Sequence, residues 1–224
     1  MGRSEPDAYR RVARWYDSIF GRLNAGLRGL GLKMLPPREG MDVLDVGCGT
    51  GIQLASYQEA GCRVSGIDTS QAMLNVARLR LGERADLRLG DAARMPYPDG
   101  AFDLVLAATV LHEMAPEVRG TVLDEMKRVL RPDGRMLVID FEVGPVRPLR
   151  GWITKAVIAI SESAAGRHHH RNYRNFMASG GLPTLLGDRG LSVDQCRIVS
   201  GGAIGVYLVR PQTLDDASPA GGAT

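Results

Sequence analysis

Short apolar runs alternate with amphipathic segments through the middle of the chain, and this alternation limits the possible folds more than any other feature. Helix-like segments with apolar residues three and four positions apart include Ser70–Leu81 and Pro116–Leu130. An alternation of this kind predicts an α/β fold with a mostly parallel sheet and helices on both faces. The strand-like runs between them are Asp42–Val46, Arg63–Ile67, Asp86–Leu89, Phe102–Ala107 and Arg135–Phe141.

The C-terminal part of the sequence departs from this alternation. Two further strand-like runs, Ser192–Ser200 and Ala203–Val209, are separated only by Gly201 and Gly202. Two glycines between strand-like runs are typical of a tight turn that joins antiparallel strands. We therefore expect a sheet of seven strands that ends in an antiparallel hairpin.

The length of 224 residues fits one α/β domain with additions better than two independent domains. Residues 1–40 precede the alternation, and we expect them to form a helical lid. Residues 41–211 form the predicted main domain, with an insertion at about 143–190 that shapes the substrate pocket. Residues 212–224 are rich in Asp, Ser, Pro, Gly and Ala, which predicts a disordered tail.

Charge and cysteine content exclude some classes of protein. A net charge of +3 is a mild excess, whereas nucleic-acid binders concentrate positive charge on one face, so no nucleic-acid partner is expected. The cysteines (Cys48, Cys62 and Cys196) form no CxxC pair and no cluster with the histidines, which favours a reducing compartment and predicts no metal site.

No apolar segment has the length of a signal peptide or a membrane span. These features predict a cytoplasmic protein without stable membrane insertion, either a monomer or a homodimer. Peripheral membrane contact stays open.

A glycine-rich loop follows the first strand-like run. Asp45, Gly47, Gly49 and Gly51 form a DxGxGxG pattern, in which glycines let the backbone approach a ligand closely. A dinucleotide-binding GxGxxG pattern would place its third glycine at position 52, which is Ile52. The Asp45 carboxylate would repel a pyrophosphate but would favour a cationic amino acid.

Two more acids follow the next strand-like runs. Asp68 suits the hydroxyls of a ribose, and Asp91 suits the amino group of an adenine. Three carboxylates at one sheet edge fit a cofactor that carries a ribose, an adenine and a positive charge but no phosphate. S-adenosylmethionine has these features, and a NAD-dependent oxidoreductase is a distant alternative.

Four segments resemble, in order and spacing, the motifs of class I S-adenosylmethionine-dependent methyltransferases. They are VLDVGCGTG, GIDTSQAML, GDAARMPYPDGAFDLV and EMKRVLRPDGRMLVID. The resemblance covers roughly Tyr16 to Asp140, and it is nearest to the ubiquinone/menaquinone C-methyltransferase-like small-molecule group. It implies a Rossmann-like fold and a methyltransferase activity with S-adenosylmethionine as cofactor and S-adenosylhomocysteine as product.

The same resemblance implies a set of cofactor-binding residues. Met73 would pack on the adenine, although a role as core filler stays open, and Tyr16 would lie near the sulfonium unless it only attaches the N-terminal helix to the core. The full set is Tyr16, Asp45, Gly47, Cys48, Gly49, Gly51, Asp68, Thr69, Met73, Asp91, Ala92 and Ala107.

Candidates for the acceptor side follow the fourth and fifth strands. His112 is the candidate catalytic residue and a candidate contact to the acceptor, and a structural role is the alternative. Glu113 is expected to be solvated. The basic stretch at 166–176 is either a solvated positive face or a source of acceptor contacts to a carboxylate or phosphate. His168–His170 has no carboxylate at ligand spacing, so no metal is predicted there. The candidate contacts in this stretch are Arg167, Arg171, Tyr173 and Arg174.

The sequence therefore predicts a methyltransferase that moves a methyl group from S-adenosylmethionine to a small-molecule acceptor, which could be amphiphilic. The transfer is expected to be an in-line displacement in which the protein aligns the acceptor with an already activated donor. The alternatives are a phospholipid amine methyltransferase and a non-catalytic S-adenosylmethionine-binding protein.

Overall fold

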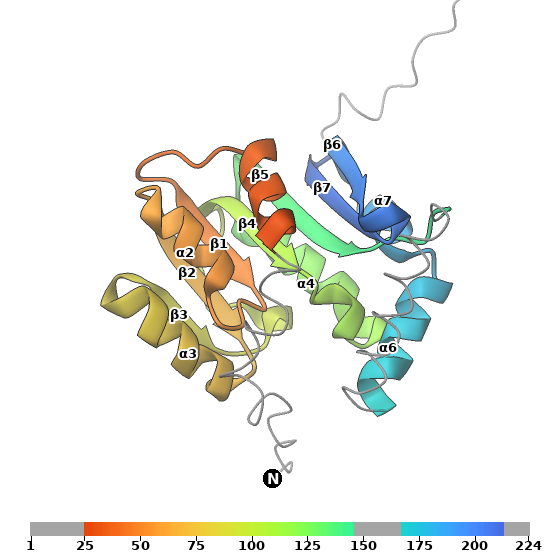
Figure 1. The fold of residues 1–224 in the computed structure, drawn as a ribbon, viewed down its shortest axis with the longest axis horizontal. Helices are drawn as coiled ribbons and strands as arrows, with labels where there is room; N and C mark the ends of the chain where they lie inside the picture. The colour runs from red at the N-terminus through yellow and green to blue at the C-terminus, as the bar shows by residue number, and fades with distance from the viewer. Residues whose placement is uncertain (1–24, 146–166, 213–224) are drawn as a thin grey trace, which may run out of the picture.

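The computed structural model describes residues 25–145 and 167–212 (Figure 1). Tyr16 and most of the expected lid lie outside the described residues, as do positions 146–166 of the expected insertion and the tail from position 213. No helix in the described ranges combines the length and hydropathy of a membrane span.

Seven strands form one sheet, as predicted. Strands β1 to β4 are Asp42–Val46, Arg63–Asp68, Asp86–Leu89 and Phe102–Ala108, and strands β5 to β7 are Leu130–Phe141, Leu191–Val199 and Ile204–Pro211. The strand order is β3-β2-β1-β4-β5-β7-β6. Strands β1 to β5 pair in parallel, while β7 is antiparallel to both β5 and β6. The Rossmann-like sheet and its C-terminal hairpin are therefore confirmed.

The helices begin and end close to the predicted positions. Helix α3 begins after Ser70, whose Oγ accepts a hydrogen bond from the Met73 amide, and α4 begins with Pro116, which is favoured at a first helical position. Residues 25–34 are also helical. The others are α2 (Ile52–Glu59), α3 (Gln71–Leu81), α4 (Pro116–Val129), α6 (Arg167–Ala178) and α7 (Gly181–Asp188), with short 3₁₀ turns η1 (Gly82–Arg84), η2 (Ala92–Arg94), η3 (Leu111–Glu113) and η4 (Ser200–Gly202).

The two ends of the sheet carry different helices. Helices α2 and α3 lie by strands β2 and β3, while α7 lies at the other end against β6, and α6 packs on α7, α4 and η3 (Figure 1). The helix of residues 25–34 packs on the middle of the sheet, where Gly31 lies against Leu137 of β5. Val43 and Leu44 of β1 are fully buried, as expected for a central parallel strand covered on both faces.

The strand order reverses beside β1. From β1 the chain builds β2 and β3 on one side, and it then places β4 and β5 on the other. In open parallel sheets, the crevice outside the carboxyl ends of the strands at such a reversal is the usual ligand site. The fold therefore directs attention to the loops after β1, β2 and β4.

Candidate functional site

A cavity of about 550 Å³ lies at this sheet edge. Its volume is within the range of small-molecule sites. Nine predicted cofactor residues line it: Asp45, Gly47, Cys48, Gly49, Asp68, Thr69, Met73, Asp91 and Ala92. Residues far apart in the sequence, from the ends of three strands, thus meet around one space.

Two of the predicted residues do not line the cavity. Gly51 has a positive φ of 71°, and a Cβ atom there would lie 2.8 Å from Leu81 Cδ1, so this glycine allows the loop to pack on α3. Ala107 is fully buried within β4, and the adjacent Ala108 lines the cavity in its place.

The glycine loop is held against the ends of its neighbours. The Gly47 amide donates to the Ile67 carbonyl at 2.8 Å. Gly47 has a φ of +70°, and a Cβ atom there would lie 2.5 Å from Val110 Cγ2. Only glycine satisfies both the backbone conformation and the close approach of the loop after β4.

Asp68 connects the glycine loop to the end of β2. One carboxylate oxygen accepts a hydrogen bond from the Gly49 amide and the other accepts one from the Ser70 amide, both at 2.8 Å. The carboxylate therefore fixes the loop and faces the cavity at the same time. A ligand at this point would meet a carboxylate whose orientation is already set.

Asp45 is the most perturbed acid of the site. Its side chain is 3% exposed, and burial, together with the negative charge of Asp68, raises the pKa of its carboxyl to about 8. A positive group bound in the cavity would favour the charged form and would lower that pKa. The site is therefore electrostatically suited to a cationic ligand.

The other predicted cofactor residues lie where expected. Met73 is 3% exposed and lines the cavity. Asp91 follows β3 and caps η2 by accepting a hydrogen bond from the Ala93 amide at 2.9 Å. Burial raises the pKa of the Cys48 thiol, which keeps it protonated and unreactive. We call the wall formed by Asp45, Asp68 and Asp91 the acidic half of the cavity.

A second part of the cavity wall comes from the segment after β4. Val110, Met114, Ala115 and Val118 line it, and we call these four residues the apolar half. Thr109, which also lines the cavity, has a φ of +52°, a conformation that a β-branched residue rarely adopts and that often marks a functional site.

Glu113 is the carboxylate beside the apolar half. Its side chain is 24% exposed and lines the cavity, so Glu113 is partly covered rather than on an open surface. Its Oε1 lies 3.3 Å from His169 Nε2 and 4.0 Å from His112 Nε2. Sequence reasoning missed this role because the histidine at position 169 comes from α6.

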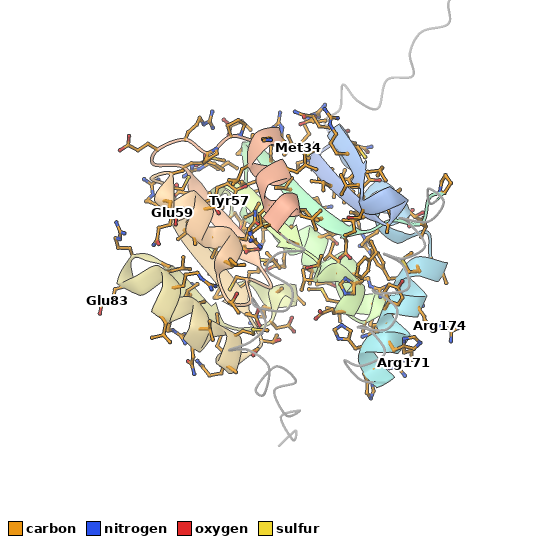
Figure 2. The ribbon with its side chains drawn as sticks, viewed as in Figure 1. Met34, Tyr57, Glu59, Glu83, Arg171 and Arg174 are labelled. Carbon is orange, nitrogen blue, oxygen red and sulfur yellow. The ribbon has the colours of Figure 1, made fainter. Side chains whose placement is uncertain are left out.

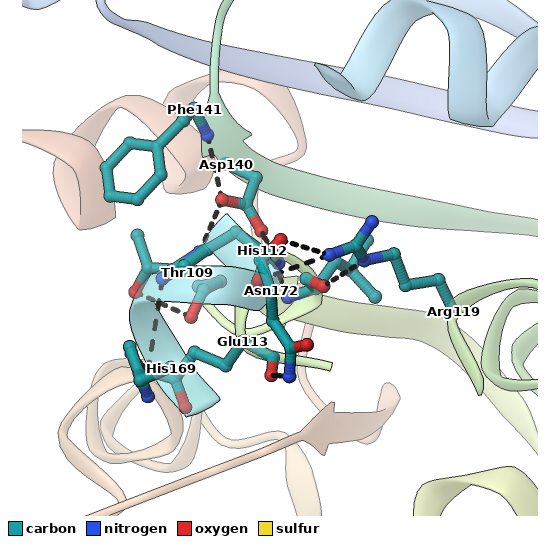
Figure 3. A network of polar contacts seen from close by, with 10 residues as sticks. Thr109, His112, Glu113, Arg119, Asp140, Phe141, His169 and Asn172 are labelled. Carbon is teal, nitrogen blue, oxygen red and sulfur yellow. Dashed lines mark hydrogen bonds and ion pairs between the residues drawn. The ribbon is translucent and has the colours of Figure 1, made fainter. Parts of the chain in front are cut away.

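His112 lies behind Glu113 and is not among the residues that line the cavity. Its side chain is 2% exposed, and Nδ1 lies 2.7 Å from Asp140 Oδ1. Asp140, which is fully buried, also accepts hydrogen bonds from the amides of Leu111, His112 and Phe141. Because a carboxylate can only accept, Nδ1 of His112 carries a proton and Nε2 points toward Glu113 (Figure 3).

Arg119 holds the segment after β4 against α6 (Figure 3). Its guanidinium donates to the Leu111 carbonyl at 3.0 Å, to the Asn172 carbonyl at 2.5 Å and to the Asn175 side chain at 3.0 Å. The Asn172 amide group in turn donates to the Glu113 carbonyl at 2.7 Å. These bonds fix the position of α6 relative to Glu113.

Three of the residues expected to contact the acceptor, Arg171, Tyr173 and Arg174, are not among those that line the cavity. Arg171 and Arg174 point away from the sheet (Figure 2) and line a separate shallow pocket on the outer side of α6. Tyr173 is buried, and its ring packs edge-on against Phe141 at 5.3 Å between centroids. Arg167 begins α6, and its side chain lies outside the described residues.

Comparisons with known proteins place this arrangement in a family. Residues 44–138 match the family model described as a methyltransferase domain. The chain is 31% identical to a demethylmenaquinone methyltransferase from Beutenbergia cavernae, over 92% of this chain and 90% of the relative. It is 34% identical to a ubiquinone/menaquinone biosynthesis C-methyltransferase UbiE from Bordetella avium, over 68% of this chain and 63% of the relative.

A solved structure agrees with these relatives. The crystal structure of an S-adenosylmethionine-dependent methyltransferase from Aquifex aeolicus matches with a TM-score of 0.58 and 25% identity, over 81% of this chain and 88% of that one. The predicted cofactor and enzyme class are thereby confirmed. With its seven-stranded sheet and its acid-lined cavity, the chain belongs to the class I S-adenosylmethionine-dependent methyltransferases, close to the ubiquinone/menaquinone C-methyltransferase-like group.

Proposed function

We propose that the chain transfers the methyl group of S-adenosylmethionine to a ring carbon of a hydroquinone-type acceptor. The observation that carries this proposal is the division of one cavity into an acidic half and an apolar half, with a single carboxylate, Glu113, beside the apolar half among the described residues. An aromatic ring suits the apolar half, and a ring hydroxyl suits Glu113. The two relatives, a demethylmenaquinone methyltransferase and a ubiquinone/menaquinone biosynthesis C-methyltransferase, are in keeping with such an acceptor.

The acidic half would hold the cofactor. Asp68 would bind the ribose hydroxyls, Asp91 and the Ala92 backbone the adenine, and Met73 would pack on the adenine ring. Asp45 would face the positively charged methionine portion, which offsets the cost of ionising a buried carboxyl. Tyr16 and the lid at residues 1–40 remain part of the proposal, although they are not in the described part of the site.

The proposed reaction is an in-line displacement. The ring carbon attacks the methyl group, a carbon–carbon bond forms, and the sulfur–methyl bond breaks to leave neutral S-adenosylhomocysteine. Loss of the ring proton from the same carbon restores aromaticity, so one proton is released overall. Removing the proton of the ring hydroxyl increases the electron density of the ring, and a positioned base contributes roughly 10²–10⁴-fold to such a step.

The test is transfer of a labelled methyl group from S-adenosylmethionine to a soluble demethylated naphthohydroquinone, with product identified by mass. A ring-methylated product is the expected result. Product methylated on oxygen would replace the carbon acceptor with an oxygen acceptor at the same site. Binding of S-adenosylmethionine without transfer to the hydroquinone, and with transfer to a phospholipid amine, would overturn the proposal.

A further inference from the structure

His112, Glu113 and His169 bring three metal-ligand atoms together beside the cavity, whose wall Glu113 lines. One ligand atom from each lies within 4.8 Å of the other two. We refer to these three residues as the His–Glu–His cluster. We infer that the cluster binds a divalent transition metal ion such as Zn²⁺, which would hold an oxygen atom of the acceptor. The role of the metal in transfer rests on the proposed function, whereas metal binding itself does not.

The donor set fits such an ion. Two imidazole nitrogens and one carboxylate oxygen bind zinc in catalytic sites, where a fourth position stays open for water or substrate. Donors about 2.0–2.2 Å from a tetrahedral ion lie roughly 3.3–3.5 Å apart. The separation between Glu113 Oε1 and His169 Nε2 is already 3.3 Å, and that between Glu113 Oε1 and His112 Nε2 is 4.0 Å. Side-chain shifts of about 1 Å would close the set.

The residues behind the cluster orient its ligands. Histidines that bind metals usually donate their other ring N–H to a carboxylate or carbonyl. Asp140 is the carboxylate that accepts from His112: its Oδ1 lies 2.7 Å from Nδ1. This hydrogen bond turns Nε2 of His112 toward Glu113. The ring of His112 also packs on Phe141 at 4.4 Å between centroids, which restricts its rotation.

The second histidine is held in place from another element. His169 lies on α6, and Arg119 and Asn172 bind this helix to the segment that carries Glu113 (Figure 3). Among the described residues of this network, the two carboxylates of Glu113 and Asp140 outnumber the guanidinium of Arg119, which favours a cation there. The N–H groups of Arg119 are directed at oxygen atoms of the protein.

The position of the cluster gives the metal a role. Glu113 lines the cavity beside the apolar half, so the open coordination position would face the space proposed for the acceptor. A bound metal lowers the pKa of a coordinated hydroxyl and fixes its orientation. A ring hydroxyl held in this way would lose its proton to solvent and would place the neighbouring ring carbon beside the methyl group.

The sequence indicated no metal because no carboxylate stands near His168–His170 at ligand spacing. In the folded chain the carboxylate is that of Glu113, in the 3₁₀ turn η3. The second imidazole is that of His112, in the same turn. Only the packing of α6 on this turn brings the three residues together.

The experiment is calorimetric titration of the full chain, first freed of metal by a chelator, with Zn²⁺. Titration with Co²⁺, whose visible absorption reports its ligand geometry, serves as a second probe. We expect one tight site, with affinity reduced at least about 100-fold in Glu113→Gln and in His169→Ala. His168→Ala is the matched control, because it removes an exposed imidazole one position away on the same helix, and it should leave the affinity unchanged.

The outcomes are distinguishable. Absence of a tight site in folded protein, or equal weakening by His168→Ala and His169→Ala, would overturn the metal inference. Circular dichroism and S-adenosylhomocysteine binding establish that each variant is folded. A tight metal site that depends on Glu113 and His169 would support the inference, whether or not a hydroquinone is methylated. A failure to methylate the hydroquinone would count only against the proposed function. An unchanged transfer rate after complete removal of the metal would refute its role in transfer.

Discussion

The acidic half and the apolar half of the cavity draw on different parts of the chain. Asp45, Asp68 and Asp91 follow three strands that come one after another in the sequence, and the parallel sheet necessarily places the ends of those strands at one edge. Beside the apolar half, Glu113 lies close to His169 because α6 packs on η3. No hydrogen-bond ladder between strands determines the distance between these two residues. Cofactor recognition is thus tied to sheet topology, whereas the acceptor side depends on side-chain packing between distant segments.

The largest expected effect tests whether the two halves act separately. Glu113→Gln keeps the size of the side chain but removes its charge, and we expect the rate of methyl transfer to fall roughly 10²–10⁴-fold. Single-turnover measurements with labelled S-adenosylmethionine would report this rate. Cofactor affinity should change by less than about twofold, since Glu113 is not in the acidic half.

Glu117→Gln provides the control for the loss of charge. Glu117 is exposed in the first turn of α4, close in sequence to Glu113 but not at the cavity. Transfer by this variant should match that of the unmodified chain. Equal losses in the two variants would remove the distinction between the halves.

The second effect should appear in the acidic half alone. Asp68→Ala removes at least one charge-assisted hydrogen bond, which contributes roughly 1.5–3 kcal/mol, so binding of S-adenosylmethionine should weaken by at least roughly 10- to 150-fold. Calorimetric titration would measure it. Asp86→Ala is the matched control, because Asp86 begins the neighbouring strand and pairs with Arg88 at the surface. An affinity that survives Asp68→Ala would refute the assignment of the ribose site.

The third effect concerns the pH dependence of stability. The folded-state pKa of Asp45 is raised from 3.8 to about 8 by burial and by Asp68, so the folded protein binds more protons than the unfolded chain between those values. The free energy of unfolding should therefore fall as pH rises through this window, by up to about 1.4 kcal/mol per pH unit. Asp45→Asn should remove this contribution and make the ligand-free protein more stable at pH 8.

Denaturant unfolding at pH 5 and pH 8 would measure this difference, in the absence and in the presence of S-adenosylmethionine. A bound cation favours ionised Asp45, so cofactor binding should release up to one proton near pH 7. If the Asn variant and the unmodified chain had parallel pH profiles, Asp45 would not be the titrating group.

The smallest expected effect lies outside both halves. Arg171→Ala should change acceptor use and cofactor binding by less than about twofold, because Arg171 lines a separate pocket on the outer side of α6. Steady-state kinetics with the hydroquinone would measure both. A selective loss of acceptor use would restore the prediction that the basic stretch contacts the acceptor, and would extend the acceptor site across α6.

The same contrast explains what could be predicted from the sequence. Asp68 and Met73 could be placed because each stands at a fixed distance from a strand end, and parallel strands bring such positions together. Gly51 was assigned to the ligand because a glycine pattern does not distinguish close approach to a ligand from close packing on α3. The sequence shows no pattern that connects Glu113 with His169. Their proximity depends on the hydrogen bonds of Arg119 and Asn172, which form only in the folded chain.

The contact between Gly47 and Val110 has a consequence for inhibitor chemistry. Gly47 lies in the loop that follows Asp45, and Val110 belongs to the apolar half, so the two halves adjoin within one cavity. A bisubstrate compound, with an adenosyl group joined to an aromatic ring by a short linker, could occupy both spaces at once. The second group would then bind at a high effective concentration, and the compound would bind more tightly than either of its parts.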